Sequence, residues 1–297
     1  SAGQTPGAVD GPDAGVRFGH ISALVFDEAG SLYAADTASH AIRKITVTGN
    51  VTTISGRRAG DLLESAPHLS EFLFPAGIAA GGTGILFVAD TYNHRIRLME
   101  PGGKTQTLAG SGAEGYADGI GENAQFAQPR GLTADDEGNV YVADTVNHVI
   151  RKITPARLVT TYAGSGTPGF TDGPAGSAQF HNPFDVRFDR SGGLFVADYG
   201  NHAIRKITPD GMVSTFVGDG VQGFLDGKGK AARLYRPSGI AFDLEGHMWI
   251  TDPHNHSVRH ITPDAQVTTL AGAGFIGTAD GTGSGAQFHF PSMLVVS

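Results

Sequence analysis

The 297-residue sequence contains no cysteine. It therefore has no disulfide framework, no thiolate metal site and no cysteine nucleophile. Long apolar runs are also missing, and none approaches the roughly 20 residues that a membrane-spanning helix needs. The first residues lack the charged and apolar regions of a signal peptide. We expect no membrane span, and we expect that any export signal was removed or never present.

Basic residues are scarce. The 21 Lys and Arg are outnumbered by 29 Asp and Glu, which gives a formal net charge of −8 at pH 7. A general nucleic-acid surface needs clustered basic side chains that displace counterions from the phosphates. We therefore expect no nucleic-acid partner.

One motif recurs five times along the chain. Its histidines are spaced 54 residues apart, at His40, His94, His148, His202 and His256. A period this regular indicates stacked copies of one supersecondary unit. The chain has 44 glycines, and Val, Thr, Ile and Phe dominate its apolar runs. This composition is typical of short strands joined by tight turns.

The third copy shows the internal plan of the repeat. Four antiparallel strands are predicted in it, over residues 129–135, 140–144, 148–154 and 159–164. Four such strands make one propeller blade. We predict an all-β chain that forms a single β-propeller domain over residues 1–297. Its blades are expected near residues 21–56, 75–110, 129–164, 183–218 and 237–272.

The motif resembles the NHL repeat. The resemblance lies in Pro-x-Gly-Leu, Gly-Asn-Val-Tyr-Val-Ala-Asp-Thr and Asn-His-x-Ile-Arg-Lys-Ile-Thr, which run from Pro129 to Thr154. The leucine of Asn-His-Leu is replaced here, for example by Val149. The resemblance implies a family of protein-binding scaffolds, carbohydrate-associated surface modules and propeller lactonases and lyases. It also implies a bacterial, secreted protein in an extracellular or periplasmic setting.

The number of blades is open at this point. First strands begin near six positions, of which the last is Pro291, but the other three strands occur in only five copies. The resemblance implies six blades. We favour six-bladed geometry with an incomplete last blade, marked by an extra inner strand over 291–297, and keep a five-bladed propeller as the alternative. An unpaired edge in that blade would allow self-association.

Asp, His and Arg recur at fixed positions in every copy, and we call them the frame residues. The aspartate ends the second strand, the histidine opens the third, and the arginine follows three residues later. A single active site needs one set of catalytic groups and not five. We therefore predict a structural hydrogen-bonded network. Its predicted members are Asp36, Asp90, Asp144, Asp198 and Asp252, together with His40, His94, His148, His202 and His256.

Positions at which the copies disagree are the best internal guide to a binding face. In the first strand, Asp185 replaces a glycine, Arg187 replaces a small residue, and Arg130 stands where most copies have Ser or Ala. Inner strands crowd toward the axis of a propeller, so we place these three side chains at the mouth of the central channel. They form either a ligand site or an arginine–carboxylate plug with no ligand.

The loop between the second and third strands also varies, as do the residues around the start of the first strand. Aromatic and polar side chains collect at these positions, a mixture that suits sugar rings or a peptide. The predicted ligand-binding residues are Tyr92, Arg130, Phe184, Tyr199, Tyr235, Arg236 and His254. Exposed aromatics of this kind also occur on propellers that bind nothing there.

Histidines near the same mouth raise the question of a metal. His20, His181, His254 and His289 come from different blades, and their spacing pairs no two of them on one face. We expect no cofactor and no metal ligands, with a metal ion at the channel mouth as the alternative. The recurring Asp-Gly pairs are expected to be turns in which Asp bonds its own backbone.

The predicted function is a rigid binding module that presents its variable loops to a protein segment or a glycan. The alternative is a propeller enzyme, a lactonase-like hydrolase or a lyase, with its site at the channel mouth. In that alternative Arg130 or Arg187 would stabilise an oxyanion. Asp185 or His254 would act as the base.

Overall fold

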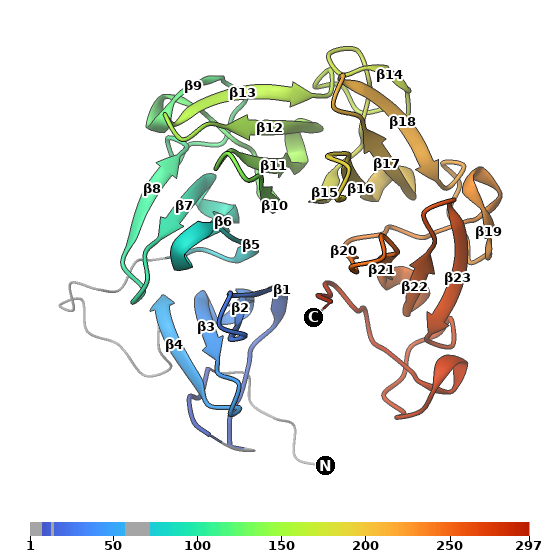
Figure 1. The fold of residues 1–297 in the computed structure, drawn as a ribbon, viewed down its shortest axis with the longest axis horizontal. Helices are drawn as coiled ribbons and strands as arrows, with labels where there is room; N and C mark the ends of the chain where they lie inside the picture. Colours follow the sequence, from blue (N-terminus) through green and yellow to red (C-terminus); the bar gives the residue numbers. More distant parts are fainter. Residues whose placement is uncertain (1–7, 13–14, 57–71, 297) are drawn as a thin grey trace. The chain divides into compact units, whose positions relative to one another are not determined.

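The computed structural model describes residues 8–12, 15–56 and 72–296. The chain is all-β and has a β-propeller fold with five blades, each a sheet of four or five strands (Figure 1). The five-bladed alternative therefore matches the structure. The chain divides into two compact units: the first comprises residues up to 140 and 154–158, and the second comprises 141–153 and 159 onward. The assignment of residues 1–297 to a single domain stays a prediction.

The first unit contains two complete blades and two further strands. The first blade consists of β1 (Ile21–Phe26), β2 (Leu32–Asp36), β3 (Ala41–Ile45) and β4 (Val51–Gly56). The second consists of β5 (Pro75–Ala80), β6 (Leu86–Asp90), β7 (Arg95–Met99) and β8 (Thr105–Ala109). The further strands are β9 (Gly119–Ile120) and β10 (Pro129–Ala134), and the short 3₁₀ helices are η1 (Thr37–Ser39), η2 (Gly82–Gly84), η3 (Thr91–Asn93) and η4 (Gly121–Asn123). Strand β5 contacts both β1 and β10, so first strands of successive blades lie side by side (Figure 1).

The second unit contains the rest of the third blade and the fourth and fifth blades. Strands β11 (Val140–Asp144), β12 (Val149–Ile153) and β13 (Leu158–Ala163) belong to the third blade, with η5 (Thr145–Asn147). The fourth blade consists of β14 (Gly173–Pro174), β15 (Pro183–Phe188), β16 (Leu194–Asp198), β17 (Ala203–Ile207) and β18 (Met212–Val217), with η6 (Tyr199–Asn201). The fifth consists of β19 (Gly227–Lys228), β20 (Ile240–Phe242), β21 (Met248–Asp252), β22 (Ser257–Ile261) and β23 (Gln266–Ala271), with η7 (Gly229–Ala231) and η8 (Pro253–Asn255), and is followed by η9 (Gly283–Gly285).

The second strands are the most deeply buried elements. Every residue of β6 and β16 is buried, and both strands read Leu-Phe-Val-Ala-Asp. A strand covered on both faces reads as a continuous apolar run, because neither set of alternating side chains meets water. The terminal aspartate is therefore carried into the interior by the strand that precedes it.

Apolar side chains from the connections fill the space between blades of the second unit. Phe180 is fully buried among Ala143 and Ile150 of the third blade and Val196 of the fourth. Leu234 occupies the equivalent place between the fourth and fifth blades. Burial of one such side chain contributes about 1.5–3 kcal/mol. These contacts hold the loops at the blade ends in fixed positions.

The end of the chain departs from our prediction. Residues 291–296 form no strand, so the extra inner strand expected over 291–297 is wrong for the described part, and six-bladed geometry is not confirmed. The carbonyl of Ser292 instead accepts hydrogen bonds from Ser238 Oγ (2.7 Å) and Thr251 Oγ1 (2.9 Å). Side-chain hydroxyls thus hold this segment in place of the backbone hydrogen bonds that a strand would have made. No helix among the described residues is long and apolar enough to cross a membrane.

Candidate functional site

The frame aspartate is held inside the blade that carries it. In the fourth blade Asp198 is fully buried and accepts three hydrogen bonds. The donors are the backbone N–H of His181 (2.8 Å), Asn201 Nδ2 (2.7 Å) and Arg205 Nη1 (2.8 Å). Asp252 is bound in the same way in the fifth blade, by Tyr235, Asn255 and Arg259. These carboxylates therefore spend most of their acceptor capacity on the protein itself.

The frame arginine joins this aspartate to the preceding connection. Arg205 is fully buried, and its Nη2 donates to Asp172 Oδ1 (2.7 Å) and to the carbonyl of Thr171 (3.0 Å). Its Nη1 also donates to the carbonyl of Gln179 (2.8 Å). The Asp-Gly pairs thus differ from our expectation, because a buried guanidinium needs counter-charges and Asp172 supplies one. Asp10 and Asp226 serve Arg43 and Arg259 in the same manner.

The frame histidine links each of the first four blades to the next and links the fifth blade to the segment that follows it. All five have a left-handed backbone, with φ between 48° and 57°. In each case Nδ1 accepts a hydrogen bond from a backbone N–H just ahead of the next strand-entry proline. The five donors are Phe74, Gln128, Asn182, Arg236 and Phe290, at 3.1–3.4 Å. An imidazole that accepts at Nδ1 is neutral and carries its proton on Nε2.

Burial supports the neutral form of these imidazoles. It is the main cause that lowers the pKa of His148, His202 and His256. Neighbouring histidines lower the pKa further, and at His202 the guanidinium of Arg236 has a larger effect than they do. The hydrogen bond from the backbone N–H to histidine Nδ1 is therefore intact at neutral pH, and protonation of the imidazole in acid weakens it.

Six side chains of the second unit form a continuous group that we call the ring cluster. Its members are Phe184, Tyr199, Tyr235, Arg236, His254 and Phe290. They come from β15, from η6 and η8, and from the residues just before Pro237 and Pro291. The first five were predicted ligand-binding residues. The sixth, Phe290, was not.

The contacts inside the ring cluster run from one blade to the next. Phe184 and Tyr199 stack with ring centroids 5.0 Å apart, and the Tyr199 hydroxyl lies 3.2 Å from His254 Nε2. The Tyr235 ring lies 4.8 Å from that of His254, which in turn lies 5.2 Å from that of Phe290. The aromatic faces therefore form a connected surface that belongs to no single blade.

Arg236 gives this surface a positive charge. Its guanidinium carbon lies 5.3 Å from the Tyr199 ring centroid and 6.0 Å from that of Tyr235. Arg236 is exposed, and no carboxylate pairs with it among the residues that the structure describes. Burial, followed by the charge of Arg236, lowers the pKa of His254. The ring cluster thus combines ring faces, one exposed cation and an imidazole with a lowered pKa.

Two predicted ligand-binding residues lie in the first unit and are not part of the ring cluster. Tyr92 is exposed in η3 and packs edge-on against Phe74, with ring centroids 5.2 Å apart. Phe74 packs in turn on His40, at 4.5 Å. Arg130 is half-buried in β10, and its carbonyl approaches Gly77 so closely that a side chain at Gly77 would clash with it.

Asp185 and Arg187 form an ion pair on β15. Arg187 Nη1 lies 3.0 Å from Asp185 Oδ1, and Asp185 Oδ2 accepts the Ile240 N–H of β20 at 3.0 Å. The carboxylate is fully buried. That burial raises the pKa of Asp185 to about 6, although Arg187 and the Ile240 N–H act in the opposite direction. The pair is thus an arginine–carboxylate contact, and the choice between a ligand site and a plug at the channel mouth stays a prediction.

One group of three side chains in the described residues has the spacing of metal ligands: Asp243, Glu245 and His247. His247 Nδ1 lies 3.3 Å from Asp243 Oδ2 and 3.8 Å from Glu245 Oε2. The group lies in the turn between β20 and β21, where Asp243 Oδ1 accepts the backbone N–H groups of Glu245 and His247. The turn itself thus explains the arrangement. The expectation of no cofactor and no metal at the channel mouth stays a prediction.

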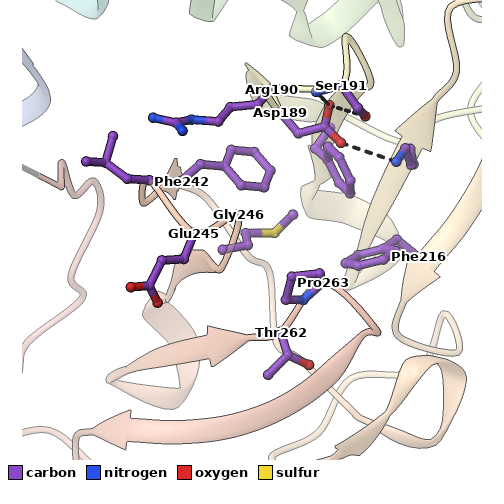
Figure 2. A pocket seen from close by; sticks show the side chains of 13 residues that line it. Asp189, Arg190, Ser191, Phe216, Phe242, Glu245, Gly246, Thr262 and Pro263 are labelled. Atoms are coloured by element: carbon purple, nitrogen blue, oxygen red, sulfur yellow. Dashed lines mark hydrogen bonds and ion pairs between the residues drawn. The ribbon is translucent and has the colours of Figure 1, made fainter.

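A pocket of about 310 Å³ lies at the other end of the fourth and fifth blades. Its walls include Phe216, Phe242 and Leu244, and Asp189 at its edge is engaged by Ser191 and Lys206 (Figure 2). A pocket of about 510 Å³ lies between the corresponding turns of the first unit. Because such pockets recur where hairpin turns of neighbouring blades meet, we attribute them to the shape of the repeat. No predicted site residue lines either one.

Comparison with known proteins agrees with the repeat. The family model of the NHL repeat matches residues 72–97 and 126–153. The chain is 31% identical over 189 residues to suppressor of quenching 1, a chloroplastic protein of Arabidopsis thaliana, covering 59% of this chain and 18% of that protein. It is 32% identical over 262 residues to NHL repeat-containing protein 2 of Bos taurus, covering 75% of this chain and 35% of that protein. The chain thus spans well under half the length of both relatives.

Solved structures share the fold. A Bacteroides thetaiotaomicron protein of unknown function superimposes with a TM-score of 0.73 and 18% identity, over 99% of this chain and 68% of that one. At this level of identity the likeness concerns the fold alone.

Proposed function

Because the chain belongs to the NHL-repeat β-propeller family, we propose that it is a rigid binding module whose ring cluster receives a protein segment or a carbohydrate. The observation that carries the proposal is the convergence of Phe184, Tyr199, Tyr235, Arg236 and His254, all at positions where the repeats differ, on one connected surface. Tyr, Trp and Arg are the residues that most often dominate binding energy at interfaces.

The frame explains how this surface would bind. Asp252 fixes the backbone N–H of Tyr235, and the His202 ring fixes that of Arg236. Two adjacent residues of the ring cluster are therefore immobilised at the main chain, one by a buried carboxylate and the other by a half-buried imidazole. A surface ordered before the ligand arrives loses little conformational entropy on binding. The expected mechanism is pre-organisation without closure of a lid.

The test is a binding screen against peptide and glycan arrays, followed by titration of the best ligand. The double substitution Tyr235→Ala and Arg236→Ala should weaken binding on the order of 100-fold, since each truncation of an interface anchor costs about 1–2 kcal/mol. Tyr116→Ala, at an exposed tyrosine in a first-unit connection, is the control and should leave the affinity unchanged. Equal affinities of the wild type and the double variant would show that the ring cluster is not the site.

A second candidate is an enzyme of the propeller lactonase or lyase type. It is favoured by a buried carboxyl group, Asp185, whose pKa of about 6 lies near neutrality, and by Arg187 beside it. Such a group can serve as a general base. Hydrolysis of a panel of lactones that disappears in Asp185→Asn and persists in Asp210→Asn would support this function. Equal turnover by both variants would reject it.

A further inference from the structure

We propose that the partner of the ring cluster is an acidic segment of a protein chain that carries an aromatic or apolar side chain next to its carboxylates. This inference rests on the proposed function and narrows it to one chemistry. Charge, ring geometry and the use of the loop amides each support it.

The first argument is the distribution of charge in the second unit. Its exposed acidic turns join β15 to β16, β17 to β18, β20 to β21 and β22 to β23, and they carry Asp189, Asp210, Asp243, Glu245 and Asp264. Neighbouring strands are antiparallel, so these turns lie at the ends of the blades opposite η6 and η8. The ring cluster lies at the η6 and η8 ends. The exposed Arg236 therefore lies at the ends of the blades away from these turns, where an anionic partner meets little repulsion from them.

The second argument is the state of Arg236. Its guanidinium is placed over Tyr199 and Tyr235, and no carboxylate neutralises it within the described part of the chain. Stacking occupies the face of a guanidinium and leaves its in-plane N–H donors for a planar acceptor. A carboxylate matches that donor edge in a two-point contact, which is stronger than a hydrogen bond between neutral groups. After burial, the charge of Arg236 is the next cause that lowers the pKa of His254, so its positive potential acts on the neighbouring imidazole ring.

The third argument separates a peptide from a sugar. A sugar binds through several hydroxyl groups, which side-chain amides match as both donors and acceptors, and the two amides of η6 and η8 are occupied. Asn201 Nδ2 donates to Asp198 and to the carbonyl of Gly169, and Asn255 Nδ2 donates to Asp252 and to the carbonyl of Gly223. The Tyr199 hydroxyl is already within hydrogen-bond distance of His254. Besides the Tyr235 hydroxyl and the His254 imidazole, the cluster offers ring faces and one cation, which suit an apolar side chain beside a carboxylate.

The test begins with selection of random displayed peptides on the full chain. We expect the selected peptides to be enriched in Asp and Glu with an adjacent aromatic or apolar residue. The best peptide and its Asn and Gln counterpart are then titrated against the wild type, Arg236→Ala and Arg190→Ala. Arg190 is an exposed arginine at the opposite end of the fourth blade, so the two variants change the net charge equally.

The expected result is a loss of about tenfold for the amide peptide on wild type, and for the acidic peptide on Arg236→Ala. Arg190→Ala should bind as the wild type does. Peptides without an acidic bias, equal effects of the two substitutions, or binding confined to glycans would each overturn this inference. If a neutral peptide binds and Tyr235→Ala abolishes its binding, the proposed function stands, and the inference that the partner is acidic is rejected. If neither peptides nor glycans bind, the proposed function itself is rejected.

Discussion

Replacement of Asp185 by asparagine should make the protein more stable at alkaline pH. The carboxyl group is fully buried, and its desolvation raises the pKa from 3.8 to about 6 despite Arg187 at 3.0 Å. A carboxyl group with a raised pKa in the folded state stabilises that state only while it is protonated. Its contribution is complete below about pH 3.8 and is lost as the pH rises through about 6.

The magnitude follows from the two pKa values. A difference of about two pKa units corresponds to about 3 kcal/mol of lost stability at pH 8 and to under about 1 kcal/mol at pH 4. Asp185→Asn removes the ionisable group and keeps the size and an acceptor for the Ile240 N–H. The free energy of unfolding of the variant relative to the wild type should therefore rise by about 2–3 kcal/mol between pH 4 and pH 8.

The assay is urea unfolding at the two pH values, followed by the fluorescence of Trp249. Trp249 is the only tryptophan of the chain and lies in β21, next to the strand that contacts Asp185 through Ile240. Asp210→Asn, at an exposed turn between β17 and β18, is the matched control. If Asp185→Asn is less stable than the wild type at pH 8, attraction to Arg187 outweighs burial and the reasoning is refuted.

Two further predictions concern the frame. His148→Ala should lose about 1 kcal/mol at pH 7.5, because the N–H of Asn182 loses its acceptor. Burial lowers the pKa of His148 below 6.5, so its contribution is present above about pH 6.5 and is lost as the pH falls; urea unfolding of variant and wild type should differ less at pH 5 than at pH 7.5. Arg205→Met leaves a buried carboxylate without its cation and should cost about 3–5 kcal/mol. Arg97→Met should cost less, because Arg97 is 14% exposed and lies 3.6 Å from its aspartate; equal shifts in thermal unfolding by circular dichroism would contradict this ranking.

The parts of the fold that depend on nearby residues were predictable from sequence. The 54-residue period located all five copies, and the alternating turn and strand signals gave strand positions within a few residues of those observed. The pairing of Asp198 with Arg205 was also accessible, because the two residues lie seven positions apart on one hairpin. A short sequence pattern is enough to predict such a pair, because a hairpin fixes the register of its own two strands.

Contacts between residues far apart in the sequence were not predictable in the same way. The hydrogen bond from the Asn182 N–H to His148 joins residues 34 positions apart, and the ion pair of Asp172 with Arg205 joins residues 33 apart. The hydrogen bond depends on how one blade is seated against the next, and the ion pair depends on how the connection before β14 folds back onto its own blade. No local pattern records either. The prediction of six blades was not confirmed for a related reason. The sequence near Pro291 repeats the pattern that precedes the first strand of the other copies, yet residues 291–296 form no strand.

The candidate site was found only in part. Departures from the repeat pointed to five members of the ring cluster. Frame positions keep the same residue because the blade needs their hydrogen bonds, whereas positions outside the frame are free to vary. Tyr92 and Arg130 met the same criterion but belong to the first unit. Phe290 was missed although it aligns with Arg236, each being the residue before the proline that recurs in the repeat. That alignment was the signal that could have included it.

The donors to the five frame histidines are all main-chain groups, whatever residue stands there. Because the donor is a backbone N–H, the bond places no demand on the side chain of the donor residue, provided that this residue tolerates a left-handed conformation. Phe, Gln, Asn and Arg all occupy this place in the present chain. These five side chains can therefore change while the hydrogen bonds between histidine and backbone persist, so that under the proposed function new specificities would arise on an unchanged scaffold.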